Sequence, residues 1–360
     1  MTRARQNANV TAAVGRNMVI NGAMNVAQRS ASATGIGNAA GYFTCDRWRI
    51  EGSTAGRLTM TQTADGPNGI SANCIKLDCT TADTSIAAGE HLIFEQKLEG
   101  QSVQRIGKGV AGAKQITVSF YVKASASFTF ACEVFDLDHS RQCTKLFSTT
   151  TDWVRHELTF PADVDDGSSP FDDDNAQSLA LFFWLHAGTD FTSGTLNTAS
   201  FANQTAANRA VGIDSFYSST DNNFFITGVQ MEVGPVATEF EQEDVGVTLA
   251  KCQRYFQKFG GQTTNDTIAA GFTNTSTFFG RGSLIKTMRA APTGALVGTN
   301  AHLNFTHTAV AANANTAPTI TTNTDTFYIQ VASGSTTTNL AGAYMRLINT
   351  GSFISFDAEL

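Results

Sequence analysis

The amino-acid sequence predicts an all-β protein: an N-terminal jelly-roll β-sandwich, a short amphipathic linker helix and a smaller C-terminal β-sandwich. Apolar and polar side chains alternate in many short segments, turns rich in Gly and Ser separate those segments, and no long helical period appears before residue 240. With 360 residues, of which 42% are hydrophobic, the chain is long enough for two domains, each with its own core.

Four segments carry the clearest strand pattern: residues 116–123, 128–134, 152–160 and 178–186. In the first of them, Ile116, Val118 and Phe120 alternate with polar side chains, as expected for a strand with one buried face. The fourth is apolar on both faces, which indicates a central or covered strand. Strands of this length, joined by loops such as residues 161–175, fit an elaborated jelly roll over residues 16–240.

The linker helix is predicted over residues 241–259. Its apolar side chains recur at gaps of four, three, four and three residues, which is the spacing of a coiled-coil seam. They are Val245, Leu249, Cys252, Phe256 and Phe259. Asp244 stands at the expected N-cap, and basic residues gather at the other end, as the helix dipole favours. A helix of about four turns is too short to be stable alone. We therefore expect it to dock on a domain or on copies of itself and to serve as an oligomerisation helix.

Residues 260–360 differ in composition, because Thr, Ala, Asn and Gly dominate and charges are few. Short segments in which apolar and polar residues alternate recur there, at residues 277–288, 327–333, 343–349 and 352–360. They predict a second, smaller β domain. The polar stretches of this domain, such as residues 300–326, are expected to be exposed loops. No internal repeat of fixed period appears, so the sequence does not favour a solenoid or a repetitive triple β-helix.

The N-terminal segment, residues 1–15, is polar and lacks the apolar region of a secretory signal. It carries Arg3 and Arg5 and no pattern that would place it in a core. We expect it to be an arm that becomes ordered on docking and attaches the protein to a larger assembly.

Composition argues against several classes of partner. Charged residues make up 15% of the chain and the formal net charge is −7, so no nucleic-acid partner is expected. No apolar run approaches the roughly 18 residues of a membrane span, so no membrane insertion is expected. The six cysteines are expected to be reduced and mostly buried. Cys132 and Cys143, which flank a turn-like segment, are the pair best placed for a disulfide.

The sequence contains no nucleophile elbow, P-loop, dinucleotide-binding glycine pattern or paired-histidine zinc motif. The histidines are dispersed, and His156 and His186 lie in strand-like runs, where a hydrogen-bonded structural role is expected. We therefore predict no catalytic residue, no metal site and no cofactor. One alternative stays open, namely that residues 161–175 bind Ca²⁺. The loop has enough carboxylates for this ion, although they lack the spacing of an EF-hand. They are Asp163, Asp165, Asp166, Asp172, Asp173 and Asp174. A solvated acidic loop is the favoured interpretation.

Aromatic side chains are the candidates for stacking on sugars, because the apolar face of a sugar packs on a ring while its hydroxyls seek polar partners. Tyr121, on the polar face of its strand, and Tyr217 are the predicted glycan-binding residues, and Trp153 is a further candidate. Trp48 and Trp184 are expected to fill the core.

Several phrases of the sequence resemble a family of tailed-bacteriophage virion proteins, especially tail fibres and tail-associated receptor-binding proteins. They are RNMVINGAMNVAQRS at residues 16–30, GYFTCDRWRI at 41–50, TGVQMEVGPVATEFE at 227–241, KCQRYFQKF at 251–259 and MRAAPT at 288–293. These blocks occur in the expected order over most of the chain. The resemblance implies a jelly roll similar to carbohydrate-binding modules, and a three-fold assembly.

The resulting hypothesis is a virion structural protein, a tail fibre subunit that binds a host surface polysaccharide without catalysis. It is expected to form a homotrimer and to meet other tail proteins through its N-terminal arm. Two alternatives stay open: a capsid decoration or head-fibre protein, and a virion enzyme that degrades glycans. The receptor-facing part is expected to be residues 260–360, with exposed loops and avidity from trimerisation. The alternative is that the jelly roll binds glycan through residues such as Tyr121.

Overall fold

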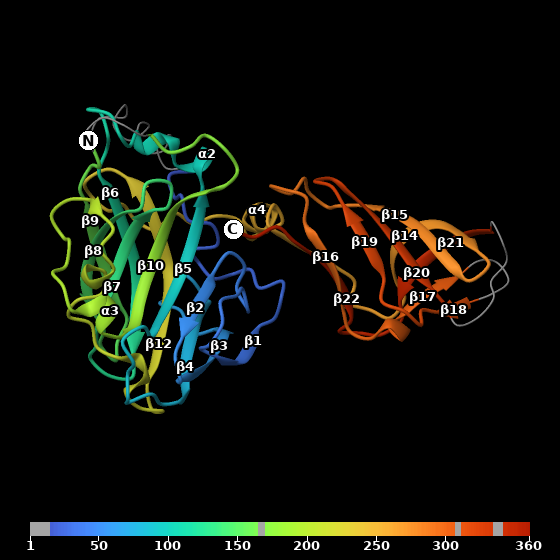
Figure 1. Cartoon of the computed structure of the whole chain (residues 1–360), viewed down its shortest axis with the longest axis horizontal. Helices are drawn as coiled ribbons and strands as arrows, with labels where there is room; N and C mark the ends of the chain where they lie inside the picture. The colour runs from blue at the N-terminus through green and yellow to red at the C-terminus, as the bar shows by residue number, and fades with distance from the viewer. Residues whose placement is uncertain (1–14, 165–169, 307–310, 334–340) are drawn as a thin grey trace. The chain divides into compact units, whose positions relative to one another are not determined.

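The computed structural model describes residues 15–164, 170–306, 311–333 and 341–360. The chain forms two compact units, one reaching to Thr248 and including Leu360, the other comprising Leu249–Glu359. We call them the first and second units (Figure 1). Both are built mainly from β-strands, which confirms the predicted fold class. Arg3 and Arg5 of the predicted attachment arm lie outside the described residues.

The first unit is a sandwich of two six-stranded antiparallel sheets. Sheet A has the strand order β1-β3-β4-β12-β6-β9, and sheet B has the order β11-β8-β7-β10-β5-β2. The strands of sheet A are β1 (Ser32–Ile36), β3 (Arg57–Thr63), β4 (Cys74–Thr81), β12 (Asn223–Val233), β6 (Ile116–Ala124) and β9 (Val154–Phe160). The strands of sheet B are β11 (Ala202–Asn203), β8 (Arg141–Ser148), β7 (Thr129–Asp136), β10 (Gln177–Ala187), β5 (His91–Glu99) and β2 (Arg49–Ser53). The chain repeatedly crosses from one sheet to the other, as in a jelly roll.

The four segments with the clearest alternation all form strands, β6, β7, β9 and β10, as predicted. β10 lies inside sheet B, between β7 and β5. One of its faces contributes Phe183 to the main core. The other face carries Trp184, which the following segment covers with Phe191 and Ala210. This double burial explains why the sequence of β10 is apolar on both faces.

The main core of the first unit lies between the two sheets. Trp48 is fully buried there and stacks on Phe94, with the ring centroids 4.7 Å apart. Phe120 of sheet A meets Phe183 of sheet B edge to face, with the centroids 5.0 Å apart. Trp48 and Trp184 are both fully buried, as predicted. Ring contacts of this kind join the sheets and add to the stabilisation that burial provides.

The helical segments are short. They are α2 (Gly100–Val103), α3 (Thr189–Thr192) and α4 (Val245–Cys252), with 3₁₀ turns at Gln104–Ile106, Ala206–Asn208, Phe216–Ser218 and Asn300–His302. None of the helices in the described part of the chain is long and apolar enough to cross a membrane.

The linker helix is shorter than predicted. α4 ends at Cys252, and the predicted seam continues as a strand, β13 (Phe256–Phe259). Asp244 lies at the N-cap as predicted, because its Oδ1 accepts a 2.8 Å hydrogen bond from the backbone N–H of Gly246. The two compact units divide inside this helix, whereas the sequence places the whole helix between two domains.

The coiled-coil seam is a wrong prediction, and the reason lies far along the chain. β13 pairs with β22 (Phe353–Asp357), so that a sheet satisfies its backbone groups. Phe259 packs in the core of the second unit, with its ring centroid 5.3 Å from that of Phe356. The five predicted seam residues differ in exposure, from exposed Val245 through half-buried Leu249 and Phe259 to buried Cys252 and Phe256.

The second unit is a smaller sandwich of a three-stranded and a seven-stranded antiparallel sheet. The first has the order β13-β22-β16, where β16 is Thr293–Val297. The second has the order β18-β17-β21-β14-β15-β20-β19. Its strands are β18 (Ala311–Asn313), β17 (Leu303–Thr306), β21 (Ala341–Leu347), β14 (Asp266–Asn274), β15 (Thr277–Ser283), β20 (Thr326–Ala332) and β19 (Thr319–Thr322). Ile354 and Phe356 of the small sheet share one buried cluster with Phe327 and Met345 of the large sheet.

The prediction that residues 300–326 are exposed loops is wrong in part. The described residues of this stretch include strands β17, β18 and β19, and Leu303 and Phe305 are buried in the core. Threonine is β-branched and is therefore favoured in strands. A Thr-rich stretch with few large apolar residues thus supplies strands of the large sheet as well as loops.

All six cysteines are buried and none of them is in a disulfide, in agreement with the prediction of reduced thiols. Cys132 and Cys143 lie on the neighbouring strands β7 and β8 but are not opposite each other. In register, Cys132 pairs with Lys145 and Cys143 pairs with Val134.

We expect a thiol reagent to label almost none of the cysteines in the folded protein and all six after unfolding. Burial raises the pKa of Cys74 to about 11, that of Cys79 to about 11 and that of Cys143 to about 12. The reactive thiolate is therefore scarce at neutral pH. Counting labelled cysteines by mass spectrometry, with and without denaturant, tests this. Rapid labelling of several thiols under native conditions would contradict the buried positions.

Candidate functional site

The loop between β3 and β4, residues 64–73, contacts the outer face of sheet A. Lys123 Nζ lies 2.8 Å from Asp65 Oδ2, and Trp153 Nε1 donates a 3.2 Å hydrogen bond to the Asp65 carbonyl. One aspartate of the loop thus binds side chains from β6 and from the segment before β9.

A glycine in β12 allows a second contact between this loop and sheet A. A Cβ added to Gly228 would lie 2.8 Å from the ring of Tyr121 and 2.9 Å from Ile70 Cγ2. The backbone of Gly228 also has φ of +60°, in the left-handed region that glycine adopts most readily. A side chain there would displace both neighbours, so this glycine is required for the packing of Ile70 beside Tyr121.

The same loop lines an open cleft of about 890 Å³ in the first unit. We call it the amide cleft, because its polar side chains are those of Asn25, Asn68, Asn73, Gln242 and Ser71. Its other lining residues are small or apolar, namely Ala64, Gly66, Gly69, Ile70, Ala72 and Val245.

Hydrogen bonds fix the amides of this cleft. Asn73 Nδ2 donates to Asn25 Oδ1 at 3.0 Å, which ties the start of β4 to the segment before β1. Gln242 Nε2 donates to the Ile70 carbonyl at 2.7 Å, which ties the segment before α4 to the β3–β4 loop. Asn25 Oδ1 also accepts a 3.5 Å hydrogen bond from Ser71 Oγ. An amide has two donors and two acceptor lone pairs, so each of these side chains keeps a donor or an acceptor for a ligand.

The lining offers hydrogen bonds but no acid–base chemistry. None of the side chains that line the cleft is a carboxylate, an imidazole, a thiol or an amine. General acid–base catalysis requires such a group within reach of the reacting atom. The arrangement therefore suits recognition of a neutral, hydroxyl-rich molecule.

A row of polar and aromatic side chains crosses sheet A beside the loop. Lys76 on β4 pairs in register with Thr61 on β3 and with Phe225 on β12. Phe225 in turn pairs with Lys123 on β6, and Trp153 lies just before β9. We call these five residues the aromatic–lysine row.

The rings of this row are half-exposed and ordered by mutual contacts. Trp153 and Phe225 meet edge to face, with centroids 6.3 Å apart. Lys123 Nζ lies 5.2 Å from the centroid of Trp153 and 4.8 Å from that of Phe225, within the range of cation–π attraction. The row thus presents apolar ring surface next to fixed polar groups.

The two predicted glycan-binding tyrosines have different surroundings. Tyr121 is half-buried, and the Arg155 guanidinium lies 5.9 Å from its ring centroid. Tyr217 is fully buried, so the prediction that it stacks on a sugar is wrong. A Cβ added to Gly56 would lie 2.5 Å from the Tyr217 ring, which shows how closely this ring packs on the backbone. Burial also raises the pKa of Tyr217.

The acidic loop at residues 161–175 was predicted to be solvated, and its first aspartate, Asp163, is buried instead. Asp163 is 7% exposed and binds Arg141 through two hydrogen bonds, of 2.9 Å from Nε and 2.7 Å from Nη2. A guanidinium, and not a solvated loop or an added cation, therefore balances this carboxylate. Asp165 and Asp166 lie outside the described residues.

Sequence reasoning missed the amide cleft. Asn25, Asn73 and Gln242 are distant in the sequence, and single amides follow no periodic pattern. Composition was the one feature of the sequence that could have pointed to the cleft. Gly, Ser and Asn concentrate in residues 66–73, as they do in long polar loops.

No family model matches the chain, and no curated protein matches it. Among solved structures, a family 61 carbohydrate-binding module in complex with β-1,4-galactotriose aligns at a TM-score of 0.29 and 11% identity, covering 61% of this chain and 99% of that one. A family 11 carbohydrate-binding module from Clostridium thermocellum aligns at 0.28 and 11%, covering 58% and 99%. An exo-β-agarase aligns at 0.29 and 10%, covering 59% of this chain and 26% of that one.

Proposed function

We propose that the protein binds a host cell-surface polysaccharide without catalysis, through the amide cleft and the aromatic–lysine row of its first unit rather than through residues 260–360. The observation that carries this proposal is the lining of the cleft, which combines fixed amides with the absence of any titratable side chain. The half-exposed rings of Trp153 and Phe225 supply the apolar surface on which a sugar face packs. Tyr121 lies on the same outer face, beside the loop that lines the cleft.

The proposed setting is the virion of a tailed phage, where the protein would be a tail fibre subunit. Its support is the set of sequence phrases described above, among them TGVQMEVGPVATEFE at residues 227–241 and KCQRYFQKF at 251–259. Residues 1–15, with Arg3 and Arg5, are proposed to attach the subunit to other tail proteins. Deleting them should leave the fold intact and abolish incorporation into particles.

A homotrimer is part of the same proposal, but it now rests on the family resemblance alone. The helix that would supply a seam ends at Cys252, and Phe259 belongs to the core of the second unit. Light scattering of the purified protein decides the matter, because a single chain has a mass of 38.3 kDa. A mass near that value at micromolar concentration would rule out the trimer.

Trp153→Ala is expected to weaken glycan binding by about 30-fold, since truncating an aromatic anchor typically costs about 2 kcal/mol. Asn73→Ala should weaken it by a smaller factor, because it removes one amide and one of the two hydrogen bonds to Asn25 Oδ1. Isothermal titration with host polysaccharide fragments measures both affinities.

Tyr344→Ala is the matched control, since Tyr344 is an aromatic residue of the second unit with 39% exposure. Loss of binding in the control alone would transfer the site to the second unit.

Two assays separate the alternative functions. A reducing-end assay on host polysaccharide should detect no turnover, and steady product release would favour a glycan-degrading enzyme. Gold labelling of the protein on intact particles should mark the tail. Labelling of the head would instead favour a capsid decoration or head-fibre protein.

A further inference from the structure

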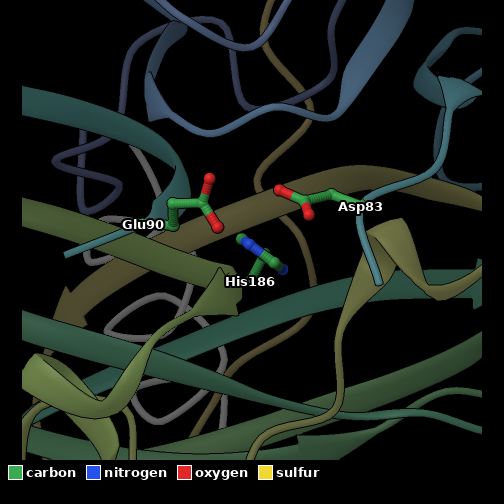
Figure 2. A group of neighbouring side chains, drawn as sticks. All are labelled: Asp83, Glu90 and His186. Atoms are coloured by element: carbon green, nitrogen blue, oxygen red, sulfur yellow. The ribbon is translucent and has the colours of Figure 1, made fainter. Parts of the chain in front are cut away.

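Three side chains outside the glycan-binding face converge at one end of the first unit. Asp83 follows β4, Glu90 precedes β5, and His186 lies near the end of β10. Their potential ligand atoms all lie within 4.8 Å of one another. Figure 2 shows the imidazole of His186 beside both carboxylates, which point toward it from different segments.

The imidazole has one nitrogen fixed and one free. His186 is fully buried, and its Nδ1 lies 2.8 Å from Ser215 Oγ. Its Nε2 makes no hydrogen bond, although the nitrogen is inaccessible to solvent. A buried polar atom without a partner is costly and is rare in folded proteins.

Backbone and hydroxyl donors orient the two carboxylates. The backbone N–H of Ala55 donates to both Asp83 Oδ2 and Glu90 Oε1, at 3.2 Å in each case. Thr54 Oγ1 donates to Asp83 Oδ2 at 2.8 Å, and the backbone N–H of Ala87 donates to Glu90 Oε2 at 2.7 Å. Donors of this kind surround metal-binding carboxylates and hold their free lone pairs in place. Two carboxylates are thereby held next to each other.

No basic side chain balances these carboxylates. Among the described residues, neither Asp83 nor Glu90 forms an ion pair with lysine or arginine. A second group of similar composition, Asp136, Asp138 and His139, gives the contrast. There, Lys108 Nζ lies 2.8 Å from Asp136 Oδ2 and 2.8 Å from His139 Nδ1, so an ammonium occupies the centre.

We propose that Asp83, Glu90 and His186 bind a divalent transition-metal ion of the Zn²⁺ type. Zn²⁺ accepts both imidazole nitrogen and carboxylate oxygen as ligands, whereas Ca²⁺ takes six to eight oxygen ligands. In a tetrahedral site, two ligand atoms at about 2.1 Å from a shared ion lie about 3.4 Å apart, so the ligand atoms must move together by up to about 1.4 Å when the ion binds. The ion would join the β4–β5 loop to β10. Half-buried Glu90 leaves a path for the metal to enter.

The test uses the full-length protein, stripped of metal with a chelator and titrated with Zn²⁺, Co²⁺ and Ca²⁺. We expect one Zn²⁺ per chain at this site, and a visible absorption band of four-coordinate cobalt when Co²⁺ is added. Glu90→Gln keeps the shape and the contacts of the side chain, and should weaken Zn²⁺ binding at least tenfold. His186→Asn keeps a polar atom near the Nδ1 position, removes Nε2, and should abolish the cobalt spectrum.

Asp138→Asn is the matched control in the group that contains Lys108, and it should bind Zn²⁺ as the wild type does. Circular dichroism establishes that each variant is folded, and Glu90→Gln keeps the test open if His186→Asn is not. The proposal is overturned if the wild type binds no Zn²⁺, if Glu90→Gln binds it unchanged, or if only Ca²⁺ binds.

Discussion

Replacing Arg209 by methionine is expected to lower the free energy of unfolding of the first unit by about 3–5 kcal/mol, the cost of leaving a buried charge without its partner. Glu133 is fully buried on the outer face of sheet B. It accepts hydrogen bonds from Arg209 Nε at 3.0 Å and Nη2 at 2.9 Å, and from Trp184 Nε1 at 2.7 Å. The guanidinium also lies 4.6 Å from the ring centroid of Phe135, so the substitution removes packing as well as charge.

The effect of this substitution should depend on pH. Burial raises the pKa of Glu133, while Arg209 and the Trp184 N–H act in the opposite direction. Without Arg209 the folded-state pKa rises further above the unfolded value of about 4.3. Below that value the carboxyl is protonated in both states, so the loss of stability is smallest there. The loss then grows as pH rises toward the folded-state pKa.

Urea unfolding followed at several pH values measures both effects. Arg209→Met combined with Glu133→Gln should regain about 1 kcal/mol or more, because the uncompensated charge is gone. Arg155→Met is the control: its guanidinium binds the Thr238 carbonyl and Glu157, whose side chain is 47% exposed, so no buried charge loses its partner and a change of about 1 kcal/mol is expected. An equal loss in the two single arginine variants would contradict a special role for the buried pair.

The strands were predictable because their signal is local. Alternation with a period of two is present within each segment, and it identified β6, β7, β9 and β10. The burial of Trp184 followed in the same way from the apolar residues around it. Most of the pairing order was not predictable, because apart from β3–β4 and β7–β8 the neighbouring strands of the jelly roll are not consecutive in the sequence.

The linker shows where a local pattern misleads. Gaps of four and three residues suit a helix seam, but Phe256 and Phe259 are held by a strand that begins at Phe353. Only the helical turns up to Cys252 formed, where Asp244 provides a local cap. Aromatic residues are also favoured in strands, so the tertiary partner decided between the two structures.

The residues of the candidate sites were harder to predict than the strands, because the fold brings them together from distant parts of the sequence. His186 was predicted to be structural because it lies in a strand, and one of its nitrogens does bind Ser215. The same imidazole has a ligand atom within 4.8 Å of those of Asp83 and Glu90, which carry no motif and lie about one hundred residues earlier in the chain. Tyr217 failed as a sugar-binding residue because only the fold reveals that it is covered.

Phe356→Ala is expected to destabilise the second unit by about 3–5 kcal/mol, the usual cost of truncating a buried phenylalanine. Phe356 is fully buried, and its ring centroid lies 4.6 Å from that of Phe327 and 5.3 Å from that of Phe259. For a unit of this size, that loss corresponds to a fall in melting temperature of more than about 10 °C. Differential scanning calorimetry should show the fall in one transition only, because the hydrophobic clusters of the two units share no residue.

Phe272→Ala is the matched control for this experiment, because Phe272 belongs to the same unit but is 44% exposed. It stacks on Phe279 at 5.3 Å, so its loss should cost less than about 1.5 kcal/mol. A third variant, Phe259→Ala, tests the predicted coiled-coil seam. If Phe259 and its neighbours formed an intermolecular coiled coil, Phe259→Ala would lower the mass measured by light scattering while leaving the melting of the second unit unchanged. If Phe259 is instead a core residue, Phe259→Ala should leave the mass unchanged and lower the melting temperature of the second unit. The reason is that Phe259 contacts Phe356, so truncating it opens a cavity in the smaller sandwich.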